Sequence, residues 1–370
     1  MRQRILIWTQ HLLGTGHFMR ARLIAEALRD GGNEVALVSG GVLPATPHIE
    51  GVRFVQLPAV RAKNELFDEL VDEHGEDASS ELLVKRRQLL LELYTDVQPH
   101  VVITETFPFG RRLLQDELLA LVDAIRLSER RPKLVSSVRD VLQRPRKNER
   151  ALAMIAYAGQ HYDGILVHSD PNVIRAETAF PELSALQHML RYTGYVCRRL
   201  AVDDSCRSEV IVSAGGGAVG AALLEMALAA KPLTSLQHLP WTIVAGPHGK
   251  LPTSSVDGVT IVRSLPDFQL RLSRAALSIS QAGYNTICET LSARTPSVVV
   301  PFETDREREQ MTRSVRLEEM GLLTLIRHAE LSAPKLAASA DEAVRRGRSQ
   351  HKINFDGMNG TVSAIASFLE

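Results

Sequence analysis

The chain has 370 residues, of which 45% are hydrophobic and 23% are charged, as is ordinary for a soluble globular protein. Its 43 basic and 43 acidic side chains cancel, which removes any global electrostatic case for binding nucleic acid. Runs of ~18 consecutive apolar residues are absent from the sequence, which argues against a membrane-spanning helix. The length exceeds what one hydrophobic core usually serves, so we expect two domains.

The cysteines and the amino terminus indicate the cellular compartment. Cys197, Cys206 and Cys288 form no C-x-x-C pair and are odd in number, which fits a reducing compartment better than a disulfide framework. They imply no metal cluster. The first apolar run lasts only about four residues before Thr9 and Gln10, too short for a signal peptide. We therefore expect a cytoplasmic protein that holds no metal.

In the first half of the chain, short β-branched runs alternate with segments of helical period. This pattern is typical of repeated βαβ units on a parallel sheet. The expected strands are RILIW, EVALVS, VRFVQL, HVVIT, KLVSSV and GILVHS. The expected helices cover residues 19–30, 82–94, 111–128 and 148–159.

The second half restarts the same cycle after a polar segment between Tyr195 and Glu209, which has the composition of a linker. We expect an α/β protein of two doubly wound domains, residues 1–200 and 207–353, with a final helix over 354–370 packing back on the first domain. The strands expected in the second domain are EVIVSAGGG, WTIVAG, VTIVRSL, ALSIS, SVVVPF and LLTLI.

Ligands of open parallel sheets bind outside the carboxyl ends of the strands, so residues that follow strands are the candidates. The first strand is followed by GTGHFMR, in which Gly16 and His17 form a turn and Arg20 shares the helix face of His17. A histidine at a helix N-terminus is favoured in its neutral form, which a general base needs. The alternative is a purely structural turn.

Further polar side chains follow two other strands of the first domain. Glu105 ends one strand and precedes FPFGRR. It either orients the histidine, faces an acceptor, or pairs with Arg111 or Arg112. Arg139 and Asp140 follow another strand, where they support a ligand or form a surface salt bridge.

The second domain opens with a strand, three glycines and a helix. The glycines are Gly215, Gly216 and Gly217. Consecutive glycines let backbone N–H groups approach an anion, and the helix N-terminus that follows carries partial positive charge. This suits a diphosphate; the alternative is a tight turn without a ligand. The spacing is not that of a P-loop.

A second candidate loop lies in LSISQAGYNTICETL. The strand is followed by a turn at Gly283, and Asn285 or Thr286 is expected at the N-cap of the next helix, where phosphate oxygens can bind. Glu289 shares their helix face and is placed to accept hydrogen bonds from ribose hydroxyls. Its alternative role is that of a capping-box partner.

Glu309 and Gln310 stand near the start of a later helix. An acid next to an amide supplies several acceptors and donors for a polyhydroxylated ligand. The alternative is a solvated, charged helix start.

Taken together, these residues resemble the GT-B glycosyltransferases, in particular the family 28-like lineage of the N-acetylglucosaminyl transferase that completes the lipid-linked peptidoglycan precursor. Within it, the chain is most similar to a group of predicted bacterial glycosyltransferases. The motifs G-x-G-H-x-x-R, F-P-F-G-R and G-Y-N-T-x-C-E recur there, and they appear here at residues 14–20, 107–111 and 283–289.

The resemblance implies roles for several of these residues. It places the three glycines near the diphosphate, makes Glu289 the ribose ligand, and puts the pair Glu309 and Gln310 on the donor sugar. Backbone contacts between Arg263 and Leu265 would hold the base, which favours UDP. His17 becomes the base or an acceptor contact. Glu105 stands where the family pattern has aspartate, a departure from it.

The implied function is an inverting, metal-independent transfer of a sugar from a nucleotide diphosphate donor to a hydroxyl or amine, with no cofactor beyond the nucleotide-sugar co-substrate. The sequence contains no D-x-D triplet. The acceptor is a small molecule or a lipid-linked one. The alternatives are a nucleotide-sugar hydrolase or epimerase, in which His17 activates water, and a non-catalytic nucleotide-sugar-binding protein.

The segment LLVKRRQLLLELY is basic and apolar at helical spacing. It is compatible with peripheral contact at the inner membrane face. The alternative is a core stripe with a solvated, charged edge.

Overall fold

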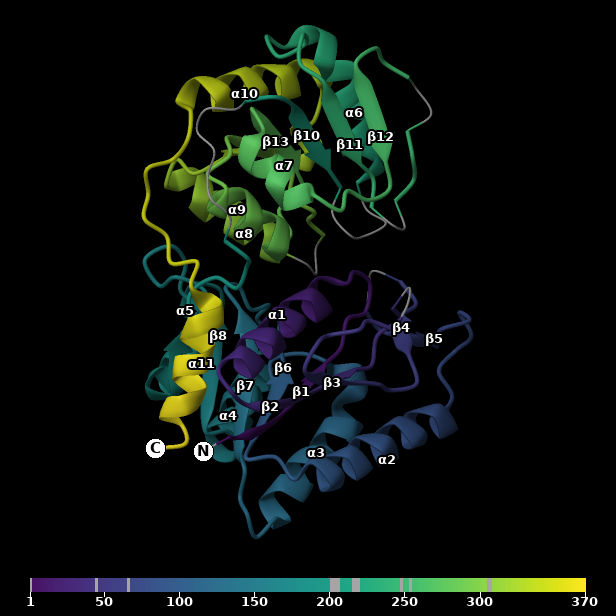
Figure 1. The fold of residues 1–370 in the computed structure, drawn as a ribbon, viewed down its shortest axis with the longest axis vertical. Helices are drawn as coiled ribbons and strands as arrows, with labels where there is room; N and C mark the ends of the chain where they lie inside the picture. The colour runs from purple at the N-terminus through teal and green to yellow at the C-terminus, as the bar shows by residue number, and fades with distance from the viewer. Residues whose placement is uncertain are drawn as a thin grey trace. The chain divides into compact units, whose positions relative to one another are not determined.

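The computed structural model describes residues 2–43, 46–64, 67–199, 207–214, 220–246, 249–252, 255–304 and 308–370. The chain divides into two compact units, shown in Figure 1. The first unit comprises Met1–Pro171, Arg175–Val196 and Asp356–Glu370, and the second comprises Asn172–Ile174 and Cys197–Phe355.

Within the described residues, the first unit is built on a seven-stranded sheet in the order β3-β2-β1-β6-β7-β8-β9, with every neighbouring pair parallel. All six expected strands are confirmed. The strands β9, β4 and β5 were not expected, because their sequences LRY, VRA and LVD do not form apolar runs. The bounds are β1 (Arg4–Thr9), β2 (Glu34–Ser39), β3 (Val52–Gln56), β6 (Val101–Glu105), β7 (Lys133–Arg139), β8 (Gly164–His168) and β9 (Leu190–Tyr192), with an antiparallel pair β4 (Val60–Ala62) and β5 (Leu70–Asp72).

Helices cover both faces of this sheet. Successive residues of β1 point to opposite faces: Leu6 and Trp8 pack with α2, α3 and α4, whereas Ile5 and Ile7 pack with α1 and α11. The helices are α1 (Gly16–Asp30), α2 (Ser80–Val97), α3 (Gln115–Leu127), α4 (Asn148–His161), α5 (Ala176–Ala179) and α11 (Gly357–Ser367), with 3₁₀ helices η1 (Arg112–Leu114) and η2 (Pro181–Met189).

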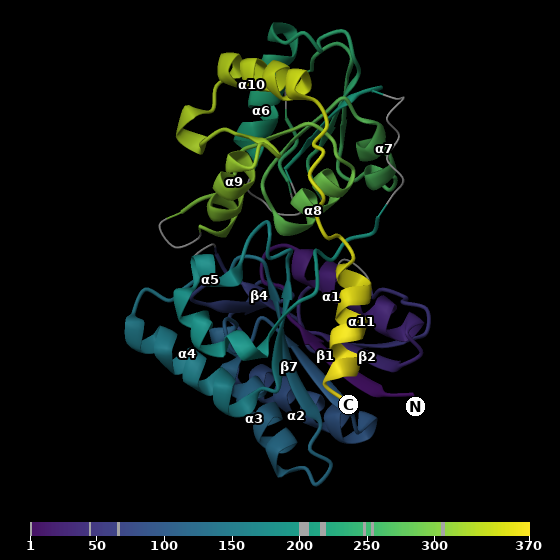
Figure 2. The same cartoon turned by 90° about the vertical axis from the view of Figure 1, so that its left-hand side faces the viewer.

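The final helix α11 lies beside α1, as Figures 1 and 2 show. Its glycines permit a close approach to the chain after β9. A Cβ at Gly360 would lie 2.1 Å from the carbonyl oxygen of Thr193. The carboxyl-terminal segment therefore belongs to the core of the first unit.

The second unit has a six-stranded parallel sheet among its described residues, in the order β12-β11-β10-β13-β14-β15. Helices α6 and α10 pack on one face, and α7 packs against Ile211 on the other. The bounds are β10 (Val210–Ser213), β11 (Trp241–Val244), β12 (Val259–Val262), β13 (Leu277–Ser280), β14 (Ser297–Val299), β15 (Thr324–Leu325), α6 (Ala221–Ala230), α7 (Phe268–Arg274), α8 (Tyr284–Ser292), α9 (Glu309–Glu319) and α10 (Ala333–Arg346), with 3₁₀ helices η3 (Lys231–Leu233) and η4 (His328–Glu330).

The expected start of α8 is wrong. The helix begins at Tyr284, and Gly283 takes the N-cap position in extended backbone with φ −60° and ψ 145°. No side chain caps the helix. Because Gly283 is the last residue with extended backbone before the helix, Asn285 and Thr286 lie inside the first helical turn.

The basic and apolar stripe of residues 82–94 forms most of α2. Leu90 and Leu93 are buried in the core, and Leu82, Leu83 and Leu89 pack against the same core. These leucines therefore give α2 no apolar face for a membrane. None of the described helices is long and apolar enough to cross one.

Candidate active site

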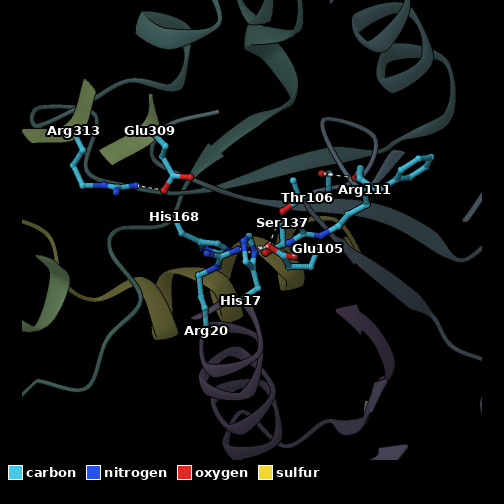
Figure 3. Close-up of polar contacts among 11 residues, drawn as sticks. His17, Arg20, Glu105, Thr106, Arg111, Ser137, His168, Glu309 and Arg313 are labelled. Carbon is cyan, nitrogen blue, oxygen red and sulfur yellow. Dashed lines mark hydrogen bonds and ion pairs between the residues drawn. The ribbon is translucent and has the colours of Figure 1, made fainter. Parts of the chain in front are cut away.

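His17 lies at the carboxyl edge of the first sheet. The strand β1 ends at Thr9, and α1 begins at Gly16, so His17 occupies the first helical turn. Glu105 is the last residue of the neighbouring strand β6. Nδ1 of His17 lies 2.6 Å from Oε1 of Glu105. Figure 3 shows this contact, which is the geometry expected if Glu105 orients the histidine; that role stays a prediction.

Glu105 is a buried carboxylate that accepts four hydrogen bonds. Oε1 accepts from Nδ1 of His17, from Nη2 of Arg20 and, at 2.7 Å, from Oγ1 of Thr106. Oε2 accepts from Nη2 of Arg111 at 3.0 Å. Burial alone would raise the pKa of Glu105, but His17, Arg111 and Arg20 hold it well below its usual range. Glu105 is therefore ionised at neutral pH, and the expected pairing with Arg111 coexists with the contact to His17.

These contacts fix the tautomer of His17. An ionised carboxylate only accepts hydrogen bonds, so Nδ1 carries the proton and Nε2 keeps its lone pair in the neutral ring. Burial and the charges of Arg111 and Arg139 lower the pKa of His17 well below its usual value, against the opposing effect of Glu105. The side chain is 16% exposed, so part of the ring is open to a reactant. Geometry and charge thus present a neutral imidazole suited to accept a proton.

A chain of buried polar side chains runs from β7, the strand next to Glu105, through β8 to the residue after β9. Oγ of Ser137 lies 2.8 Å from Nε2 of His168, and Nδ1 of His168 lies 2.8 Å from Oγ1 of Thr193. Burial and the charge of Arg20 lower the pKa of His168 well below its usual value, so this ring is neutral. The sequence analysis missed His168, although a polar residue at the end of GILVHS was a usable signal.

Thr106 adopts a left-handed backbone conformation with φ 67°, which is unusual for a β-branched residue. Its N–H donates to the carbonyl of Ser137 at 2.9 Å, and its hydroxyl donates to Glu105. A Cβ at Gly110 would lie 2.7 Å from Cγ2 of Thr106, so the loop needs glycine there. Strained backbone of this kind is common where a site must hold a fixed geometry.

Arg139 is the last residue of β7, and Asp140 follows the strand. Arg139 is half-buried, and its charge acts on both His17 and Arg111. Asp140 is fully buried, and its Oδ1 accepts the N–H of Val141 at 2.9 Å. The alternative of a surface salt bridge is therefore wrong for Asp140, because its carboxylate does not reach the surface.

In the second unit, Glu289 lies on α8 and is half-buried. Its Oε1 accepts a hydrogen bond from Nε2 of Gln269, on α7, at 2.8 Å. Burial raises the pKa of Glu289, and the bond from Gln269 opposes the change. The assignment of Glu289 to ribose remains a prediction.

Gln310 and Glu309 begin α9 at the carboxyl ends of β13 and β14. Oε1 of Gln310 accepts the N–H groups of Ala282 at 3.1 Å and Phe302 at 3.0 Å, which ties the two loops after these strands together. Glu309 is only 8% exposed and bonds Nη2 of Arg313 at 2.6 Å. The alternative of a solvated helix start is therefore wrong, because Glu309 is a buried, paired carboxylate.

Arg313 extends this arrangement. It donates to the carbonyl of Ala282 at 2.9 Å, and its guanidinium lies 5.6 Å from the ring centre of Tyr284. Arg263 is exposed after β12 and donates to the carbonyl of Gly249 at 3.2 Å, while Leu265 is half-buried in the same loop. The predicted glycines Gly215, Gly216 and Gly217 lie outside the described residues, as does Cys206.

The structure thus gathers His17, Arg20, Glu105 and Arg139 in the first unit. In the second, the predicted residues are distributed over the ends of three strands. In the described part of the chain, we find no group of three or more His, Cys, Asp or Glu side chains that could hold a metal ion.

Sequence comparison identifies the second unit. Residues 211–356 match the glycosyltransferase family 28 C-terminal domain. The chain is 33% identical over 75 residues, 20% of its length and 22% of the relative's, to the UDP-N-acetylglucosamine--N-acetylmuramyl-(pentapeptide) pyrophosphoryl-undecaprenol N-acetylglucosamine transferase of Thermotoga maritima. It is 26% identical to the transferase of the same name from Thermosipho africanus over 153 residues, 41% of the chain and 44% of the relative. These matches span between a fifth and less than half of the curated relatives.

Structure comparison covers both units. The calicheamicin glycosyltransferase CalG4 matches with a TM-score of 0.63 and 15% identity over 100% of this chain and 99% of its own. Acinetobacter baumannii MurG matches with a TM-score of 0.59 and 17% identity over 98% and 99% of the two chains. The chain therefore has the GT-B fold, as expected. It is related to the N-acetylglucosamine transferases named above.

Proposed function

We propose that this protein is an inverting, metal-independent glycosyltransferase, which moves a sugar from a nucleotide diphosphate donor to a hydroxyl or amine acceptor. The observation that carries the proposal is the contact between His17 and ionised Glu105 at a sheet edge, in a chain whose second unit matches family 28. The first unit would take the acceptor and the second the donor.

In the proposed reaction, Nε2 of His17 removes the proton of the acceptor while the acceptor oxygen or nitrogen bonds the anomeric carbon. The bond from that carbon to the diphosphate breaks, and the nucleotide diphosphate leaves with the electron pair. Glu105 stabilises the imidazolium that forms. A positioned general base of this kind contributes about 10²- to 10⁴-fold in rate.

We propose a UDP-sugar as the donor. The curated relatives are named for UDP-N-acetylglucosamine, and Glu289 offers an acceptor of hydrogen bonds for ribose hydroxyls. The N-terminus of α8 carries partial positive charge that would stabilise the leaving diphosphate. We also propose a lipid-linked acceptor, because the same relatives are named for a pyrophosphoryl-undecaprenol acceptor. With such an acceptor, the protein would make peripheral contact with the inner face of a membrane.

Thermal unfolding in the presence of nucleotides tests the donor assignment, because a ligand that binds only the folded state raises the Tm. We expect UDP and UDP-sugars to raise the Tm of the wild type, and Glu289→Ala to weaken the effect. Glu319→Ala, on the exposed end of α9, is the matched control and should respond as the wild type does. Stabilisation by a dinucleotide cofactor alone would overturn the proposal.

A further inference from the structure

A side-chain hydrogen bond joins α7 to α8 in the second unit, where the two helices pack together (Figure 1). Nε2 of Gln269, in the first turn of α7, donates to Oε1 of Glu289, in the second turn of α8, at 2.8 Å. Both side chains are half-buried. The bond therefore restricts the rotation of the Glu289 carboxylate and leaves part of it open to a ligand.

The hydrogen bond occupies only part of the carboxylate. Each carboxylate oxygen can accept two hydrogen bonds, and Gln269 supplies one donor to Oε1. Among the contacts of the described residues, this is the one hydrogen bond to the carboxylate of Glu289. Oε2 and the second lone pair of Oε1 are therefore available to two neighbouring hydroxyls, such as those of a ribose.

Gln269 also acts on the charge of Glu289. Burial raises the pKa of Glu289, and the bond from Gln269 lowers it; within the described part of the chain, nothing else shifts this pKa. On α7, Arg271 bonds Glu209 instead. Burial raises the pKa of the Cys197 thiol to about 12, so this neighbour adds no charge. A neutral amide thus does for Glu289 what a cation does elsewhere, because its N–H favours the ionised form.

The position of α7 in the chain gives the bond a further consequence. The helix follows directly on the loop of Arg263 and Leu265, which is expected to hold the base of the nucleotide. Glu289 is the residue expected to meet the ribose. Gln269 therefore connects the segment proposed for the base to the side chain proposed for the sugar beside it.

We propose that Gln269 is a positioning residue, which holds Oε1 of Glu289 so that the carboxylate meets both hydroxyls of a ribose. The donor site then selects a nucleotide that carries both ribose hydroxyls over a deoxynucleotide. This inference rests on the proposed function, since it assigns the sugar of the nucleotide at the same donor site.

The test compares UDP with 2′,3′-dideoxy-UDP, which lacks both hydroxyls, by isothermal titration calorimetry on the full chain. We expect the wild type to bind UDP about tenfold or more tightly than the dideoxy nucleotide, because the latter loses hydrogen bonds to a charged group. Gln269→Met keeps the length of the side chain and removes the donor. It should reduce the preference to about threefold or less by weakening UDP alone.

Three further variants separate positioning from a structural role. Gln269→Lys keeps a donor at a similar reach and should restore most of the preference. Glu289→Ala should abolish it, and adding Gln269→Met to Glu289→Ala should change nothing more, because Gln269 acts through Glu289. Gln237→Met, at an exposed position of the same unit, is the matched control and should keep the wild-type preference. The Tm of each variant without nucleotide checks that it is folded.

The pH dependence of the preference is the second readout. Protonation of Glu289 removes acceptor capacity, so the preference should fall as the pH falls through the pKa of Glu289. Without the bond from Gln269 this pKa is higher, so the loss should begin at a higher pH in Gln269→Met than in the wild type. Titration of the diphosphate affects both nucleotides alike and cancels in the ratio of their dissociation constants.

Equal binding of the two nucleotides by the wild type would overturn the inference, and so would a preference in Gln269→Met that matches the wild type at every pH. Both results leave the proposed function standing, since UDP still binds. Failure of both nucleotides to bind the wild type would instead contradict the UDP donor of the proposed function, and the inference would fall with it.

Discussion

His17 combines a fixed tautomer with a weakly basic ring. Because burial and arginine charges hold its pKa well below 6.5, the ring is neutral and competent throughout the neutral range. The acid limb of kcat/KM, which reports the free enzyme, should therefore lie below pH 6.5, with a plateau above it. Initial velocities measured from acidic to alkaline pH check this. A limb above pH 7 would mean that a different group is the base.

Thr106 contributes one of the three donors on Oε1 of Glu105. The change Thr106→Val keeps the shape and removes the donor. A hydrogen bond to a charged group is worth about 1.5–3 kcal/mol, so we expect kcat/KM to fall by about tenfold or more. The acid limb in the pH profile of kcat/KM should also move to a different pH.

The control for this change is Thr95→Val, on the exposed side of α2, which bonds only the carbonyl of Leu91 among the contacts described. Thr95→Val should leave kcat/KM and the pH of its acid limb unchanged. If Thr106→Val kept wild-type kinetics at every pH, Thr106 would not position Glu105.

At the scale of elements, a buried ion pair joins α2 to α3. Nε and Nη2 of Arg86 each bond Glu117 at 2.9 Å, and Nη1 bonds the carbonyls of Gly40 and Pro58. Nη2 also bonds Oε1 of Gln10, in the loop that leads to His17. The pair therefore ties both helices to the loops at the active edge of the sheet.

Removing one partner of a buried ion pair leaves the other charge uncompensated. Arg86→Met should lower the free energy of unfolding by about 3–5 kcal/mol, measured by urea denaturation. Lys85→Met, at an exposed position of the same helix, should change it little. A loss as small as that of the control would show that Glu117 finds another partner.

The elements also show what sequence patterns can predict. Strands buried on both faces, such as β1 and β10, form apolar runs that are visible in the sequence, and all the longer strands were predicted. The strands β4, β5 and β9, which are not apolar runs, and the N-cap at Gly283 depend on tertiary contacts and backbone angles that the sequence pattern does not show. Contact between Glu105 and His17 was one of the expected alternatives, because both residues stand at the carboxyl ends of expected strands. Thr106 and His168 were missed because their roles depend on side-chain directions.

At the scale of the whole molecule, the two Rossmann-like units carry different chemistry. The first holds the candidate base His17 together with Glu105 and the arginines that bond it, Arg20 and Arg111. The second carries the family 28 domain. A chain that only bound a nucleotide sugar would need the second alone. The contact between His17 and Glu105 in the first unit is thus the reason to propose sugar transfer rather than binding of a nucleotide sugar alone.

Release of nucleotide diphosphate from a UDP-sugar, with and without an extract of small molecules and lipids as acceptors, tests the account most directly. We expect release that requires the extract and that falls by about 10²-fold or more in His17→Ala. Release at the same rate without any acceptor would instead identify a hydrolase. Turnover unchanged in His17→Ala would contradict the central claim, that His17 is the base of a glycosyl transfer.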